Sequence, residues 1–208
     1  MMGPENEGVF QRETTRSTEE VQQTDSQRFT DNLLAVFRDC HRVLKDDGLL
    51  IFTYHHSRPE GWSAILEAIH EAGFYIEATH PVKSEMSVSI PKQQAKSPID
   101  IDIIIVGRKL ALIEPFPQVP LDLFGECVEE TSEIVEAFNR SNRRLSRSDV
   151  TVIMMARLIT TLSRARDLEK TLSYLSSAER DMGAVVERVW KQQNPRKILV
   201  EEQQMTIF

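Results

Sequence analysis

The sequence predicts a mixed α/β domain whose sheet ends in an antiparallel hairpin, followed by a small α-helical subdomain. Between residues 29 and 109, apolar residues alternate between helical and strand spacing, as they do when helices connect the strands of a sheet. After residue 109, "LIEPFPQVPLDLF" carries three prolines and leads into three helical patterns. We therefore divide the chain into an N-terminal segment (1–28), an α/β part (29–109), a proline-rich linker (110–122) and a helical part with a tail (123–208).

Residues 1–28 are rich in Glu, Gln, Thr and Ser, and their substantial apolar side chains are Val9, Phe10 and Val21. Such a segment buries too little surface to offset the entropy lost on ordering. We expect it to be mobile or loosely docked.

The α/β part begins with helical spacing from Phe29 to Leu44, which ends at a turn containing Gly48. The continuous apolar run from Leu49 to Tyr54 predicts a strand covered on both faces. A second helix is expected from Pro59 to Gly73, since proline is well tolerated in a first turn.

Two more strands are expected at Phe74–Val82 and Ile101–Gly107. This order predicts a parallel α/β sheet that ends in an antiparallel hairpin. Because three strands make a small sheet, the natural interpretation is half of a doubly wound domain.

The helical part has three patterns, at residues 123–140, 148–166 and 168–190. The middle pattern is apolar almost all round, so we expect it to be the central buried helix, with Ser148 as a candidate N-cap.

Composition narrows the function classes. The formal net charge of −7 argues against a general binder of polyanions. Cys40 and Cys127 lie far apart among apolar neighbours, as reduced thiols of a cytoplasmic protein do. No apolar run reaches the length of about 20 residues that a membrane span needs, so we expect no membrane partner.

The sequence "TYHHS" places His55, His56 and Ser57 at the carboxyl end of the first expected strand. In open α/β sheets ligands bind at that edge, so these side chains are candidates for the wall of a pocket. The alternative is that they cap the strand and hold the following loop. The five histidines lack the compact spacing of a structural zinc site, so no metal is expected.

Several motifs together suggest a family. "FTDNLLAVFRDCHRVLKDDGLLIFTYHHS", "GWSAILEAIHEAGFYIEATHPVKSEMSVS" and "IDIDIIIVGRK" resemble the later part of class I S-adenosylmethionine-dependent methyltransferases. The closest resemblance is to the large predicted adenine-specific DNA methylases, and it covers residues 29–109. It implies a Rossmann-like sheet, S-adenosylmethionine as cofactor, DNA as partner, and methyl transfer to adenine N6 or, less favoured, cytosine N4.

The same resemblance implies that His55, His56, Ser57, Glu85 and Ser87 form part of the base-pocket wall. For the loop that contains Glu85 and Ser87, a solvated hairpin loop is the alternative. Trp62 could stack on a base, but at the start of an apolar helical face it is more typical of a core residue.

Two motifs of these enzymes are missing from the sequence. No two glycines lie close enough to form the glycine-rich cofactor turn, and there is no Pro-Pro dipeptide for the tetrapeptide that holds the target amine. We therefore interpret the chain as a fragment or split subunit that is inactive alone and joins an upstream half or a second copy. A non-catalytic regulatory module that kept the half-fold is the alternative, and a methyltransferase acting on RNA or a small molecule ranks third.

Seven arginines and one acidic residue lie between residues 140 and 166, after a helix rich in glutamate. One interpretation assigns Arg140, Arg143, Arg144 and Arg147 to the DNA backbone, where they would neutralise phosphates. The other pairs the arginines with the acidic helix, which is the more common use of such charges.

Overall fold

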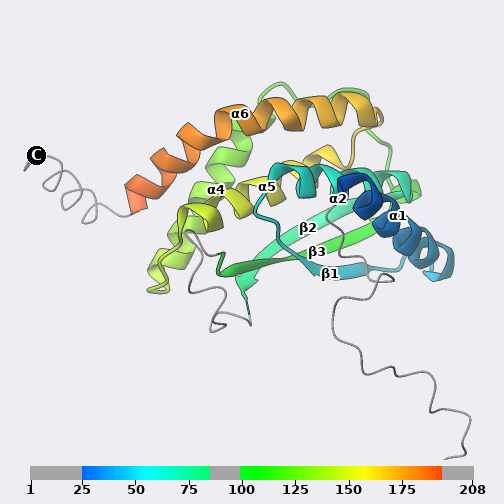
Figure 1. The fold of residues 1–208 in the computed structure, drawn as a ribbon, viewed down its shortest axis with the longest axis horizontal. Coiled ribbons are helices and arrows are strands. Elements are labelled where there is room, and N and C mark those ends of the chain that lie inside the picture. Colours follow the sequence, from blue (N-terminus) through cyan, green and yellow to red (C-terminus); the bar gives the residue numbers. More distant parts are fainter. Residues whose placement is uncertain (1–24, 85–98, 194–208) are drawn as a thin grey trace, which may run out of the picture.

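The computed structural model describes residues 25–84 and 99–193, and Figure 1 shows their arrangement. The helices and strands in chain order are α1 (Ser26–Val43), β1 (Leu50–Tyr54), α2 (Pro59–Glu71), β2 (Phe74–Lys83), β3 (Ile101–Lys109), the 3₁₀ turn η2 (Leu110–Leu112), α4 (Leu123–Arg140), α5 (Arg147–Leu162) and α6 (Leu168–Gln193). The prediction of a mixed α/β protein is confirmed. No helix within the described ranges is both long enough and apolar enough to cross a bilayer.

The three strands form one sheet in the order β1-β3-β2. β3 pairs antiparallel with both neighbours, so β1 and β2 run in the same direction and are connected through α2. The prediction of a parallel sheet is therefore wrong for the described strands, because β3 lies between β1 and β2 and keeps them from pairing with each other. The predicted hairpin of the second and third strands is present. Its last strand lies between the other two, which leaves β1 at one edge of the sheet with β3 as its strand partner in the described part of the chain.

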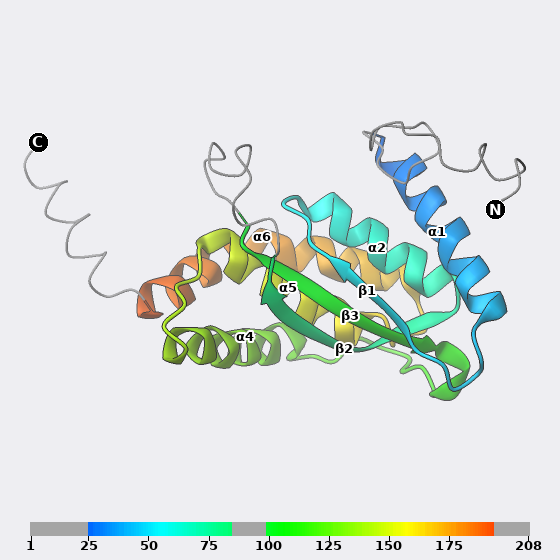
Figure 2. The ribbon, with the colours of Figure 1, turned by 90° about the horizontal axis from the view of Figure 1, so that it is seen from below.

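The helices cover one face of this sheet. In Figure 2 the strands lie in front and α2, α5 and α6 lie behind them. On the covered face, Ile103 and Ile105 of β3 are buried, whereas on the opposite face Ile51 of β1 is 57% exposed. The expectation that β1 is covered on both faces is therefore wrong. Alternate residues of a strand point to opposite faces, and the described helices supply a layer for one of them.

We call this opposite face the open face. The strand register places Ile51, Val106 and Ala78 side by side on it, with Ile104 next to Thr53 and His80. An edge strand beside a partly exposed apolar face favours association with another chain.

The helix α5 lies at the centre of the molecule, as the sequence predicted. Its apolar residues are buried nearly all round the helix and belong to the same core as the sheet and α2. The helix begins at Arg147, and its N-cap is Ser146, which lies two residues before the expected cap Ser148. Asp149 explains the shift, because Ser146 and Asp149 form a reciprocal capping box.

Polar contacts also fix α5 to β2. Ser163 Oγ accepts a hydrogen bond of 2.8 Å from the backbone N–H of Ile76, and Arg157 donates one of 2.8 Å to the carbonyl oxygen of Thr79. The linker is held at the end of α5 by backbone hydrogen bonds. The N–H of Phe116 donates to the carbonyl oxygen of Arg164, and the N–H of Arg166 donates to that of Phe116.

The first helix starts earlier than the sequence suggested. Asp25 caps α1 by accepting a hydrogen bond from the N–H of Arg28, so residues 26–28 are helical rather than part of a mobile segment. The rest of that predicted segment, residues 1–24, lies outside the described residues.

We expect the isolated protein to self-associate through the β1 edge and the open face. The variant Ile51→Lys should shift the protein toward monomer, because a charge on an edge strand blocks pairing between sheets. Sedimentation velocity over a range of concentrations measures this. Val43→Lys is the matched control, since Val43 is 69% exposed at the end of α1 and outside the sheet. A wild-type protein that sediments as a monomer and binds no apolar dye would contradict the expectation.

Candidate functional site

The two adjacent histidines leave β1 on opposite faces of the sheet. His55 lies on the open face, where its Nδ1 contacts the carboxylate of Asp102 on β3. His56 lies on the helix-covered side, where its ring stacks on that of Tyr54 with a centroid distance of 6.4 Å. The alternation of the strand thus continues through residues 55 and 56, so the two imidazoles do not line one pocket together. The structure thus separates residues that the sequence analysis grouped.

The imidazole of His56 is held between β1 and the first turn of α2. Its Nδ1 lies 3.1 Å from the nitrogen and 2.8 Å from the carbonyl oxygen of Arg58. The ring lies directly against Gly61, where an added Cβ would come within 2.2 Å of the imidazole Cγ. The indole of Trp62 donates a 3.0 Å hydrogen bond to the carbonyl oxygen of His56, and Tyr54 Oη donates one of 2.6 Å to that of Gly61. These contacts join the end of β1 to α2.

A pocket of about 260 Å³ lies next to this junction. Its walls come from the β1–α2 connection, from α5 and from α6. The lining residues are His56, Ser57, Arg58, Pro59, Trp62, Thr151, Met155, Glu179, Met182, Gly183 and Val186. We call it the α6 pocket.

Two of the five residues predicted for a base-pocket wall, His56 and Ser57, line the α6 pocket. His55 is directed to the other face, and Glu85 and Ser87 lie outside the described residues. Trp62 is 1% exposed and belongs to the core, which favours the packing role over base stacking.

Glu179, the acidic group of the α6 pocket, was not predicted from the sequence. Burial, and to a lesser degree the neighbouring Glu60, raises the pKa of this carboxyl group. Its Oε1 is buried, and no hydrogen-bond partner for it occurs among the described residues. No local pattern in the sequence marks this residue, because only the packing of α6 brings it to the end of β1.

Three of the arginines between residues 140 and 166 form ion pairs within the protein. Arg140 pairs with Glu136 at 3.5 Å within α4. Arg147 pairs with Glu187, and its guanidinium lies 3.7 Å above the ring centre of Trp190. Arg157 pairs with Glu130 of the acidic helix at 3.5 Å, as the pairing interpretation expects.

Arg143 and Arg144 differ from these. Both are exposed, and no ion pair of either is among those found in the described ranges. Together with Lys83 they line a second pocket of about 330 Å³ near the start of β3. Of the four arginines assigned to DNA, these two are the ones with side chains available for phosphate.

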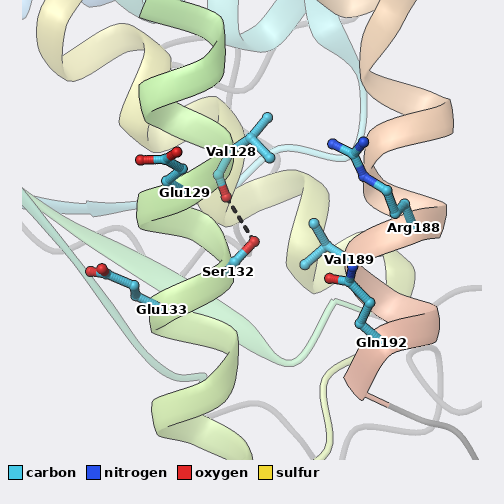
Figure 3. Close-up of a pocket in the computed structure, with 7 residues that line it drawn as sticks. All are labelled: Val128, Glu129, Ser132, Glu133, Arg188, Val189 and Gln192. Atoms are coloured by element: carbon cyan, nitrogen blue, oxygen red, sulfur yellow. Dashed lines mark hydrogen bonds between the residues drawn. The ribbon is translucent and has the colours of Figure 1, made fainter.

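Figure 3 shows a larger groove of about 430 Å³ between α4 and α6. Ser132 faces α6, but its hydroxyl already donates a 2.8 Å hydrogen bond to the carbonyl oxygen of Val128. Glu129 and Glu133 extend over the outer side of α4, away from Arg188. Because its polar groups do not converge, this groove is a weaker candidate than the α6 pocket.

No group of three His, Cys, Asp or Glu side chains in the described part of the chain is placed to hold a metal ion. Compared with models of known families, with curated proteins and with solved structures, the chain gives no match.

Proposed function

We propose that this chain is the carboxyl-terminal portion of a DNA amino-methyltransferase and works with a separate half that holds the cofactor. The assembled enzyme would transfer a methyl group from S-adenosylmethionine to the exocyclic amine of adenine, with cytosine as the second choice. The motifs in residues 29–109 suggest this class. The structural observation that supports the proposal is the edge position of β1, which pairs only with β3 among the described strands.

The topology is compatible with the end of such a sheet. Strands β1 and β2 run in the same direction and are joined by a helix, and the antiparallel strand β3 lies between them, so they form an α/β unit closed by a hairpin. A unit of this kind can be extended at β1, and the open face leaves room for a second layer. The α6 pocket then lies at the carboxyl end of β1, the edge where α/β sheets bind ligands.

The residues of this chain do not fit S-adenosylmethionine. The class needs a glycine-rich turn after a strand, where the backbone approaches the ligand. The one glycine with a positive φ in the described ranges is Gly73, at 82°, and it ends α2 next to His41. We therefore assign cofactor binding and the methyl-transfer step to the other half.

One observation favours the alternative of a non-catalytic module. Two of the four candidate DNA arginines, Arg140 and Arg147, are engaged in ion pairs within the protein. If Arg143 and Arg144 contact DNA in the assembly, then replacing both with glutamate should weaken DNA binding and reduce its salt dependence. A regulatory module would show no such effect.

The isolated chain is expected to bind S-adenosylmethionine more weakly than a dissociation constant of about 10 μM, which corresponds to roughly −7 kcal/mol. The reason is that the chain has no glycine-rich turn. Isothermal titration calorimetry measures the affinity directly. Binding tighter than this limit would show that the cofactor site is in this chain, and the two-part proposal would fail.

A further inference from the structure

The α6 pocket has the composition of a small-molecule site. Its deeper walls are apolar and include Trp62, Met155, Met182 and Val186, and the first three of these are buried to 4% exposure or less. At about 260 Å³ it exceeds the 150 Å³ or so of a cavity that can hold one benzene ring. Pockets that combine apolar walls with a few convergent polar groups are typical ligand sites.

Glu179 is the acidic residue of the pocket wall. Its Oε1 is buried and has no hydrogen-bond partner in the part of the chain that the structure describes. A buried acceptor without a donor opposes folding, so its presence at a pocket wall suggests that a ligand supplies the donor. Glu60, the acidic neighbour, adds to the negative potential at this point.

Gly183 lies at the exposed rim of the pocket. It is exposed in the middle of α6, where glycine is unfavourable compared with alanine. An added Cβ would meet no atom within 4 Å, so packing does not require glycine at this position. A large side chain here would instead extend over the opening.

We propose that the α6 pocket binds a small, flat aromatic amine or amidine. The ring lies among Trp62, Met155 and Met182, and an N–H group of the ligand donates a hydrogen bond to Oε1 of Glu179. The site belongs to the free chain and needs no second half, so its test is independent of the methyltransferase proposal.

The probe is 2-aminopyridine. The matched ligand is 2-methylpyridine at a pH where its ring nitrogen is unprotonated, so that it has no N–H donor. Titrations are followed by NMR on ¹⁵N-labelled protein, whose two tryptophans provide internal reporters. The indole signal of Trp62 should shift, whereas that of Trp190, which stacks on Arg147 elsewhere, should not. We expect a dissociation constant on the order of 1 mM for so small a ligand. Binding of 2-methylpyridine should be at least about tenfold weaker, because it cannot form the charge-assisted hydrogen bond.

Two variants separate a binding role from a structural one. Glu179→Leu should raise the melting temperature, because it removes an unpaired buried acceptor, and should abolish the preference for the amine. Gly183→Phe should weaken 2-aminopyridine binding at least about tenfold by covering the opening. Ala184→Phe is the matched control, because Ala184 is exposed on α6 and does not line the pocket, so binding should stay unchanged.

Equal affinity for the two pyridines, no shift of the Trp62 indole signal, or a lower melting temperature in Glu179→Leu would each overturn the proposal.

Discussion

Replacing Asp149 with alanine is expected to lower the free energy of unfolding by about 3 kcal/mol. Asp149 is 1% exposed and connects two parts of the fold. Its Oδ1 accepts a 2.7 Å hydrogen bond from the N–H of Asp100, just before β3, and its Oδ2 accepts 2.8 Å bonds from the N–H and hydroxyl of Ser146. The substitution removes the acceptor of all three donors and half of the capping box of α5.

Urea denaturation measures this change. Asp181→Ala is the control, because Asp181 is exposed on α6 and should change stability by less than about 0.5 kcal/mol. A loss of less than about 1 kcal/mol in Asp149→Ala would mean that the carboxylate does not hold β3 to α5.

The second large effect is expected at Gly61. Alanine normally stabilises a helix relative to glycine, but here we expect a loss of about 1–3 kcal/mol. An added Cβ would come within 2.2 Å of Cγ of His56, so the imidazole must leave its position. The ring would lose its stacking on Tyr54, and the α6 pocket would lose part of its wall.

The variant His56→Ala provides the test of this mechanism. If the clash with the imidazole is the cause, Gly61→Ala should cost little in the His56→Ala background, with a coupling energy above about 1 kcal/mol. Denaturant melts of the four proteins complete the cycle. Gly183→Ala is the control, since its Cβ meets open space and should stabilise α6 by about 0.5–1 kcal/mol. Additive effects of Gly61→Ala and His56→Ala would contradict the role assigned to the ring.

Much of the fold could be predicted because apolar spacing records which side of an element is buried. Ile101, Ile103 and Ile105 are buried at alternate positions of β3, as its strand pattern requires. The buried character of α5 was equally clear from its composition.

The coverage of β1 could not be predicted in the same way. A continuous apolar run shows that both faces favour burial, but it does not show what covers them. Ile51 is 57% exposed in this chain, and exposed apolar side chains of this kind are typical of an interaction surface.

Only part of the candidate site could be predicted from the sequence. The position of His56 at the end of β1 was predicted, and strand alternation alone could have shown that His55 turns to the other face. Glu179 could not be found this way, because its place depends on how α6 packs across the β1–α2 connection.

The most direct test of the two-part enzyme is a methyl-transfer assay. The chain is tagged and purified under native conditions from its own source, and labelled S-adenosylmethionine is supplied together with unmethylated DNA. We expect that the purified assembly labels the amino group of adenine, that the isolated chain does not, and that Ile51→Lys lowers transfer by weakening the β1 edge. Transfer by the isolated chain, or an assembly that binds DNA without labelling it, would show that the chain is not half of such an enzyme.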